Sequence, residues 1–122
     1  MTGPGPEAEW RTALAEGRFT LQRAIDSGTW FFPPRHVEPR TGEADWEWLE
    51  ASGMGTVYSA TVIHPKPPAE PYAVVLIDLD EGPRLMSRID GLPAADIAIG
   101  QRVRARIVHE DDAPLLVFEP AR

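Results

Sequence analysis

The fold is decided by residues 53–64, Gly-Met-Gly-Thr-Val-Tyr-Ser-Ala-Thr-Val-Ile-His, where β-branched and aromatic residues follow two glycines and precede a proline. A run of this composition between turn residues predicts a β-strand. Comparable runs recur along the rest of the chain. The predicted strands cover residues 55–64, 72–78, 84–89, 102–109 and 115–119.

No long helical pattern separates these strands, which favours an antiparallel barrel that is closed or nearly closed. Closure removes the unpaired edges that an open sheet would expose. We therefore expect a mainly β protein built on a five-stranded OB-fold barrel, with residues 92–97 plugging one end. Gly53 and Gly55 are interpreted as a bend at the entrance of the first strand, since the third glycine and the following helix of a dinucleotide site are missing.

The composition bounds the class of protein. The chain has 122 residues with 13 prolines, 10 glycines and 43% hydrophobic residues, which is typical of one folded domain with an appendage. It has no cysteine, so disulfides, a thiol nucleophile and cysteine-ligated metals are excluded. The acidic N-terminal stretch lacks the features of a signal peptide, and we expect a cytoplasmic protein without membrane association.

The formal charge of −7 disfavours nucleic acid as a partner, because such binding depends on cations that neutralise phosphates. Arg102, Arg104 and Arg106 alternate with apolar residues and share one face of a predicted strand. We interpret them as an exposed face paired with acidic neighbours rather than as a phosphate-binding stripe.

The N-terminal part predicts a short helix. Residues 1–6 are rich in Gly and Pro and are predicted to be disordered. A helix is expected over residues 7–16, with Trp10, Ala13 and Leu14 on one face and Gly17 at its end. So short a helix is marginal alone, and Trp10 must dock either on the chain's own barrel or on a partner protein.

Residues 20–49 predict a small sheet that is dense in aromatic residues. A strand over residues 19–24 and a turn at residues 26–28 lead to Trp30, Phe31 and Phe32 before two prolines. A second turn at residues 39–42 precedes Trp46 and Trp48, whose alternation with acids indicates a strand with one aromatic face.

A set of motifs, taken in their order along the chain, resembles that of a known protein family. It comprises Leu-x-Glu-Gly-Arg-Phe-x-Leu-Gln-Arg, a Trp-x-x-Pro-Pro-Arg element between two turns, Gly-x-Gly-Thr-Val-Tyr-Ser-x-Thr-Val, a proline loop ending in Pro-Tyr, Leu-Asp-Glu-Gly-Pro-Arg-Leu, and Ile-Gly-x-x-Val. From Trp10 to Pro120 the chain resembles a bacterial and archaeal family of acyl-CoA-associated proteins. Its members join an N-terminal helix and a rubredoxin-like zinc ribbon to an OB-fold, and accompany thiolases, thiolase-like aldolases and hydratases.

The resemblance implies three parts: a tail and docking helix (1–18), a zinc-ribbon-like element (19–50) and the OB-fold barrel (51–122). The family's four metal-binding cysteines fall on Ala24, Ser27, Glu38 and Thr41. Only Glu38 can ligate, and even with His36 nearby the set falls short of the four ligands of a structural zinc. We predict a degenerate ribbon without zinc.

Something must replace the roughly 10–16 kcal/mol that zinc supplies to small metal-folded domains. Burial of five aromatic rings could contribute about 1.5–3 kcal/mol each. A thin ribbon cannot cover so many rings, so we expect a partner surface to cover several; the alternative is that the ribbon folds back on the barrel. The predicted partner-binding residues are Trp10, Leu14, Trp30, Phe31, Phe32, Arg35, Trp46 and Trp48.

No catalytic constellation is found. The histidines lack metal spacing, no serine lies in a nucleophile elbow, and the paired carboxylates lie in predicted turns. The proline loop 65–71 is a stiff arm at the barrel rim. The residues predicted to contact a ligand or to line a substrate channel are His64, Lys66, Pro68, Tyr72, Arg84 and Arg88, the cations being candidates for acyl-CoA phosphates.

The sequence thus predicts a non-catalytic accessory subunit that completes a thiolase-superfamily or related acyl-CoA enzyme in a hetero-oligomer. It binds no cofactor of its own, and acyl-CoA is a possible ligand of the complex. Two alternatives remain: a free-standing carrier of acyl-CoA or another small ligand, and an oligonucleotide-binding OB-fold, which the acidic charge disfavours.

Overall fold

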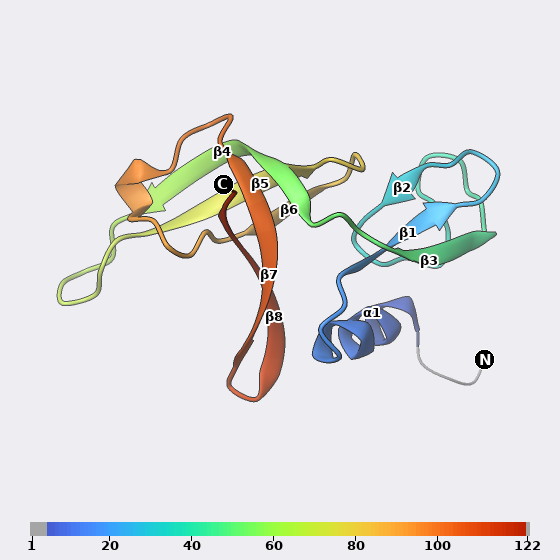
Figure 1. Ribbon diagram of the computed structural model, residues 1–122, viewed down its shortest axis with the longest axis horizontal. Helices are drawn as coiled ribbons and strands as arrows, with labels where there is room; N and C mark the ends of the chain where they lie inside the picture. Colours follow the sequence, from blue (N-terminus) through green and yellow to red (C-terminus); the bar gives the residue numbers. More distant parts are fainter. Residues whose placement is uncertain (1–4, 122) are drawn as a thin grey trace.

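The computed structural model describes residues 5–121, which form two small sheets and one helix (Figure 1). The N-terminal elements are α1 (Pro6–Ala15), β1 (Thr20–Ala24), β2 (Trp30–Phe31) and β3 (Trp46–Glu50). The larger sheet contains β4 (Met54–Ile63), β5 (Tyr72–Leu79), β6 (Arg84–Ser87), β7 (Arg102–Glu110) and β8 (Ala113–Pro120). A 3-10 turn, η1 (Ala94–Asp96), lies between β6 and β7.

The larger sheet has the strand order β6-β5-β4-β7-β8, and all its neighbours are antiparallel. Its two edges meet: Phe118 N–H donates to Arg88 O (3.0 Å), Asp90 N–H donates to Phe118 O (2.8 Å), and Ile89 forms a parallel bridge with Phe118. This is a nearly closed five-stranded barrel, as predicted. β6 is shorter than expected because residues 88–90 leave β5 and pair with β8 instead.

Two features of β4 allow the sheet to curl. The register with β5 shifts between Val57 and Ser59, and such a bulge increases local twist. At Gly55 a Cβ atom would lie 2.7 Å from Ile77 Cγ2 and 2.9 Å from Asp78 O, so only glycine permits this approach of β4 to β5. Gly53, with φ +80°, provides the bend predicted at the start of the strand.

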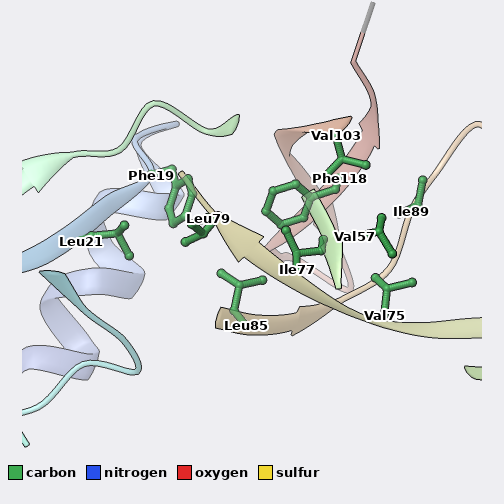
Figure 2. Packing of buried hydrophobic residues seen from close by; sticks show 10 residues of the cluster. All are labelled: Phe19, Leu21, Val57, Val75, Ile77, Leu79, Leu85, Ile89, Val103 and Phe118. Atoms are coloured by element: carbon green, nitrogen blue, oxygen red, sulfur yellow. The ribbon is translucent and has the colours of Figure 1, made fainter. Parts of the chain in front are cut away.

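The core lies inside the barrel and extends toward the ribbon (Figure 2). Ile77, Val103 and Phe118 are fully buried at its centre. Phe19, just before β1, and Leu21, the second residue of β1, belong to the same buried cluster and join the two sheets through one apolar core. Leu92 and Ile97, on either side of η1, pack against this cluster at the position of the predicted plug.

The smaller sheet, residues 20–50, has the order β2-β1-β3 and will be called the ribbon. The five residues of β1 pair with β3 in an unbroken antiparallel register from Thr20↔Glu50 to Ala24↔Trp46. β2 is only two residues long because Pro33 and Pro34 follow it and have no N–H to donate. The predicted strand with Trp46 and Trp48 is confirmed as β3.

Helix α1 packs against β1 and β8, below the ribbon and beside the β7–β8 hairpin (Figure 1). It begins one residue earlier than predicted, since Pro6 is its buried first residue, a position where proline costs no hydrogen bond. The disorder predicted for residues 1–6 is therefore wrong at Pro6. Residues 1–4 of that stretch lie outside the described part of the chain. Within residues 5–121 no helix is long and apolar enough to cross a membrane.

Candidate functional site

The ribbon carries two turns, here called knuckles, formed by residues 24–29 and 38–43. Each closes through a backbone bond across four residues: Gly28 N–H donates to Ala24 O (2.9 Å) and Gly42 N–H donates to Glu38 O (2.8 Å). These turns contain the four positions at which the resemblance places metal ligands. The loss of cysteine has therefore left both knuckles folded.

Glu38 is turned into its own knuckle and is only 1% exposed. Its Oε2 accepts hydrogen bonds from the N–H groups of Arg40 (2.9 Å) and Thr41 (2.6 Å). Burial raises the pKa of this carboxyl, but these bonds, the Thr41 hydroxyl and the charge of Arg40 together hold the pKa below its ordinary value. The one residue at a ligand position that could bind a metal thus serves as an acceptor for the backbone.

Glu43 connects the second knuckle to the first. Its Oε1 lies 2.9 Å from Thr41 Oγ1, and its Oε2 accepts a hydrogen bond from Ser27 N–H at 3.4 Å. The Thr41 hydroxyl also lies 2.8 Å from Glu38 Oε2, and its single proton can serve only one carboxylate at a time. Contacts with Ser27 lower the pKa of the Glu43 carboxyl more than burial raises it, and the Thr41 hydroxyl lowers it further.

These residues do not fit a structural zinc. Ala24 offers no donor atom, Ser27 and Thr41 offer only neutral hydroxyls, and the Glu38 carboxylate is already engaged. Among residues 5–121, no group of three or more His, Cys, Asp or Glu side chains is placed to hold a metal ion. The element is a degenerate zinc ribbon whose knuckles are joined by the Glu43 carboxylate, while the Glu38 carboxylate stabilises one of them from inside.

The predicted partner-binding residues are not equally accessible. Leu14 and Phe31 are 2% and 5% exposed, so neither can contact a partner in this conformation. Leu14 is covered because the apolar face of α1 meets β1 and β8, and Phe31 is buried on the short strand that pairs with β1. For these two side chains the alternative, packing within the chain, is what the structure shows.

Trp10 also has partners within the chain. Its ring meets Phe32 edge to face, with centroids 5.5 Å apart, and its Nε1–H donates to Thr20 O at 2.9 Å. Trp10, Trp30 and Phe32 remain half-buried and pack against the core cluster. The ribbon therefore does fold back on the barrel, and only the outer parts of these rings remain available for another protein.

Trp46 and Trp48 form a second aromatic pair on the outer face of the ribbon, again edge to face at 5.5 Å. Trp46 Nε1–H donates to His36 O (2.7 Å), and Trp48 Nε1–H donates to Glu9 Oε1 of α1 (3.3 Å). Both rings are half-buried, and Arg35, which precedes the His36 whose carbonyl accepts from Trp46, is exposed. These three side chains can be reached from solvent.

An apolar groove of about 190 Å³ lies where helix, ribbon and barrel meet, and will be called the junction groove. Met86, 69% exposed, and Leu115, 39% exposed, form its outer wall. Sequence reasoning missed both, because they lie on different strands, β6 and β8, and no local pattern shows that the fold brings them together. The groove is lined by Trp10, Arg11, Leu14, Phe32, Leu85, Met86, Pro114, Leu115 and Leu116.

The residues predicted to contact a ligand do not form one site. His64, Lys66, Pro68 and Tyr72 are exposed around the β4–β5 loop. Arg84 pairs with Asp78 near the other end of β5. At 3.3 Å per residue, Asp78 lies about 20 Å along the strand from Tyr72. Arg84 also donates to Asp78 Oδ1 from Nε (2.6 Å), and its guanidinium lies 3.4 Å from the Tyr58 ring centroid.

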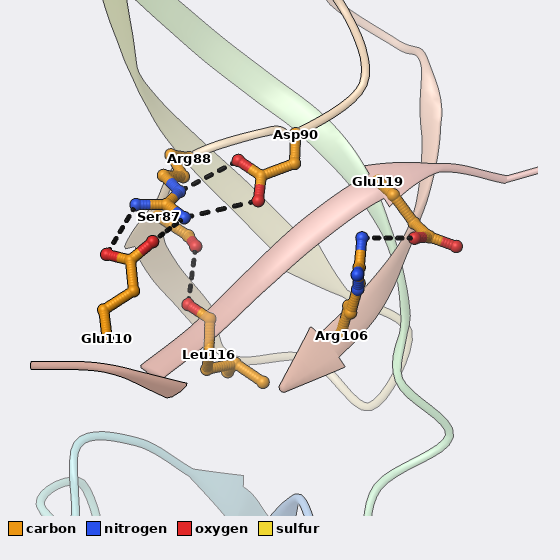
Figure 3. Close-up of polar contacts among 7 residues, drawn as sticks. All are labelled: Ser87, Arg88, Asp90, Arg106, Glu110, Leu116 and Glu119. Carbon is orange, nitrogen blue, oxygen red and sulfur yellow. Dashed lines mark hydrogen bonds and ion pairs between the residues drawn. The ribbon is translucent and has the colours of Figure 1, made fainter. Parts of the chain in front are cut away.

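Arg88 lies near the loop end and lines a hollow of about 200 Å³ together with Tyr72. Figure 3 shows its guanidinium between two carboxylates: Nε donates to Asp90 (2.9 Å) and Nη1 to Glu110 (3.1 Å). Hydrogen bonds to Glu110 and then Asp90 raise the pKa of Arg88 further. The phosphate-binding role expected for Arg84 and Arg88 stays a prediction, and a phosphate would have to compete with the carboxylates that both guanidiniums already contact.

The three alternating arginines of β7 are also paired. Arg102 donates to Asp80 (2.7 Å), Arg104 donates to Glu119 (2.7 Å), and Arg106 lies 3.8 Å from Glu119. This confirms the interpretation of an exposed, salt-bridged face. It removes the arginine stripe that an oligonucleotide site would need.

Together, the barrel, the degenerate ribbon and the docked helix define a class of small OB-fold proteins that carry a ribbon and a helix before the barrel. Residues 48–108 match the family described as the C-terminal OB-fold domain of ChsH2. A DUF35 domain-containing scaffold protein of Methanocaldococcus jannaschii is 33% identical over 79% of this chain and 74% of its own length. The chain belongs to this ChsH2-like DUF35 family.

Two other similarities bear on the function. A probable enoyl-CoA hydratase alpha subunit of Thermomonospora curvata is 38% identical over 93% of this chain, which spans only 37% of that protein. A solved chain of the Ltp2-ChsH2(DUF35) aldolase is 34% identical, with a TM-score of 0.83 over 100% of this chain and 99% of that one. A DUF35-family protein from Sulfolobus solfataricus, 19% identical with a TM-score of 0.71, shares the fold.

Proposed function

We propose that this protein is a non-catalytic accessory subunit of an acyl-CoA-processing enzyme, an aldolase, hydratase or thiolase-superfamily member. The similarity that carries the proposal is the one to the ChsH2(DUF35) chain of an aldolase, which extends over the whole of both chains. Relatives named as hydratase alpha subunits and as scaffold proteins support the same class of role.

The chemistry of the described residues agrees with a role outside catalysis. The chain's three histidines, His36, His64 and His109, are all exposed, and none lies in a pocket beside a second acid–base group. The arginines most suited to phosphates, Arg84 and Arg88, are held by carboxylates of the same chain. A free-standing acyl-CoA carrier is therefore less well supported than a subunit whose partner performs the reaction.

The partner surface that we propose combines the junction groove with the outer aromatic face of the ribbon. Met86 and Leu115 lie beside the outer parts of Trp10 and Phe32 and form a continuous apolar region at the groove. Exposed apolar surface of this kind is typical of protein interfaces. In this arrangement Leu14 and Phe31 support the surface from beneath. The proline loop 65–71, at the other end of the barrel, is proposed to line the partner's substrate channel.

The test is co-expression with the acyl-CoA aldolases, hydratases and thiolases of the same organism, followed by size-exclusion chromatography. Wild type should co-elute with one of these enzymes, and Met86→Glu combined with Leu115→Glu should weaken the complex at least tenfold, because charge would enter a desolvated patch. Ile99→Glu is the matched control, since Ile99 is 73% exposed outside the groove. A wild-type chain that stays monomeric would reject the proposed role. Equal losses of binding in the double variant and in Ile99→Glu would reject the proposed surface.

A further inference from the structure

A second groove, of about 400 Å³, lies between α1 and the ribbon and will be called the helix–ribbon groove. One wall is a single stripe of the helix at positions i, i+3, i+4 and i+7: Glu9, Thr12, Ala13 and Glu16. The other wall comes from Arg18, Thr20 and Trp48. Of the predicted partner-binding residues only Trp48 lines it, and it shares no lining residue with the junction groove.

The charge of this groove is negative. Glu9 and Glu16 lie one at each end of the helical stripe, and both are exposed. Arg18 is the one cation among its lining residues, and it lies 3.2 Å from Glu50 and 3.9 Å from Glu16. Because Arg18 is shared with a carboxylate outside the groove, the lining retains an excess of negative charge. An anionic ligand such as a CoA phosphate does not fit here.

One residue that lines the groove has a buried hydroxyl without a partner. Thr20 is 2% exposed and lines the groove, and its Oγ1 is buried without a hydrogen-bond partner. Its backbone oxygen is already engaged by Trp10. Buried hydroxyls are nearly always hydrogen-bonded in folded proteins. A donor that enters from the groove would complete this one.

Trp48 supplies the third component. Its indole N–H is held by Glu9 at 3.3 Å, which fixes the ring at the side of the groove. A fixed indole beside carboxylates is a favourable surface for a planar cation. Two separated carboxylates, a hydroxyl acceptor and an aromatic ring match a guanidinium, which presents five N–H donors in one plane. A lysine ammonium is a point charge and cannot reach all of these groups at once.

We propose that the helix–ribbon groove binds an arginine side chain of the partner subunit. This rests on the proposed function for the identity of the partner. The guanidinium lies along the Trp48 ring, pairs with Glu16 and Glu9, and donates to Thr20 Oγ1. The interaction gives the assembly a polar, directional contact that fixes the orientation of the partner.

The probe is Nα-acetyl-arginine amide, with the neutral Nα-acetyl-citrulline amide of nearly the same shape as control. Binding is followed by the indole N–H resonance of Trp48 in nitrogen–proton correlation spectra, with Trp30 as internal reference because it lies outside the groove. We expect a saturable shift of Trp48 with the arginine compound and at least several-fold weaker binding of the citrulline compound. Equal binding of both compounds, or no saturable shift, would overturn the proposal.

Variants locate the site. Glu16→Gln should weaken binding several-fold, whereas Glu7→Gln on the same helix should not, because Glu7 pairs with Arg11 and does not line the groove. Thr20→Val should also weaken binding, with circular dichroism confirming the fold. Equal effects of the two glutamate variants would refute the location. A chain that binds the probe but joins no acyl-CoA enzyme would reject the proposed function alone, and one that joins the enzyme without binding the probe would reject the groove alone.

Discussion

The Glu43 carboxylate accepts a hydrogen bond from the Ser27 backbone N–H at 3.4 Å and so joins the two knuckles through residues that lie sixteen positions apart in the chain. On its other oxygen the same carboxylate meets the Thr41 hydroxyl at 2.9 Å. In a zinc ribbon one ion would hold four side chains together. Here a glutamate spans the two knuckles, while Glu38 stabilises one of them from inside.

Replacing Glu38 with glutamine should destabilise the ribbon. The backbone N–H groups of Arg40 and Thr41 would then meet either the NH2 group of the glutamine, which is itself a donor, or its neutral carbonyl oxygen, which is a weaker acceptor than a carboxylate. We expect the thermal midpoint to fall by several degrees. Glu47→Gln is the control, since Glu47 is an exposed residue of β3. A midpoint unchanged in both variants would show that the knuckle does not depend on this carboxylate.

Stability should decrease in acid. The pKa values of Glu38 and Glu43 are lowered in the folded state from an ordinary value of 4.5. Their contribution is therefore complete above about pH 4.5 and is lost as the pH falls through the lower folded pKa values. Asp80 and Glu110, whose pKa values are lowered by Arg102 and Arg88, act in the same direction.

Urea unfolding at a series of pH values measures this dependence. In Glu43→Gln the acid-induced loss should be smaller than in wild type, because one of the titrating groups has been removed. A curve parallel to that of wild type would mean that Glu43 titrates with the same pKa in folded and unfolded chains.

Restoring cysteine at positions 24, 27, 38 and 41 should restore metal binding. The variant carrying Ala24→Cys, Ser27→Cys, Glu38→Cys and Thr41→Cys would present four thiolates on two knuckles that are already closed by backbone bonds. We expect one tightly bound zinc per chain by elemental analysis and tetrahedral cobalt absorption bands. Reverting position 24 to alanine should weaken binding strongly. Failure of the four-cysteine variant to bind metal would contradict the assignment of these positions.

Leu14→Ala should destabilise the isolated chain by about 2–5 kcal/mol, the usual cost of removing a buried leucine side chain. Leu14 is 2% exposed against β1 and β8, so this cost should appear without any partner. Arg11→Ala on the same helix should cost less than about 1 kcal/mol, because its pair with Glu7 is exposed. Chemical denaturation distinguishes the two. Equal small effects would mean that α1 does not dock on its own chain in solution.

The strands were predictable because their signal is local. β-branched runs bounded by Pro, Gly and Asp reproduce the five barrel strands to within a few residues, and the alternation of Trp46 and Trp48 reproduces β3. The accessible part of the candidate site was less predictable. Met86 and Leu115 come from strands at opposite edges of the sheet order, and no local pattern shows that barrel closure brings them to one groove.

The sequence by itself determined that the chain forms a barrel and that its ribbon lacks the ligands for zinc, because strand periodicity and the absence of a donor atom are properties of single segments. Only the tertiary structure decided what the remaining polar side chains do. Glu38 could be identified as the one possible ligand, but its role as a buried acceptor depends on the closed turn around it. In the sequence Arg88 is a cation without an obvious partner. In the folded chain it contacts Glu110 of β7, twenty-two residues away. Contacts between distant segments depend on how the whole chain packs around its core. Composition and local spacing therefore cannot show which polar side chains will meet.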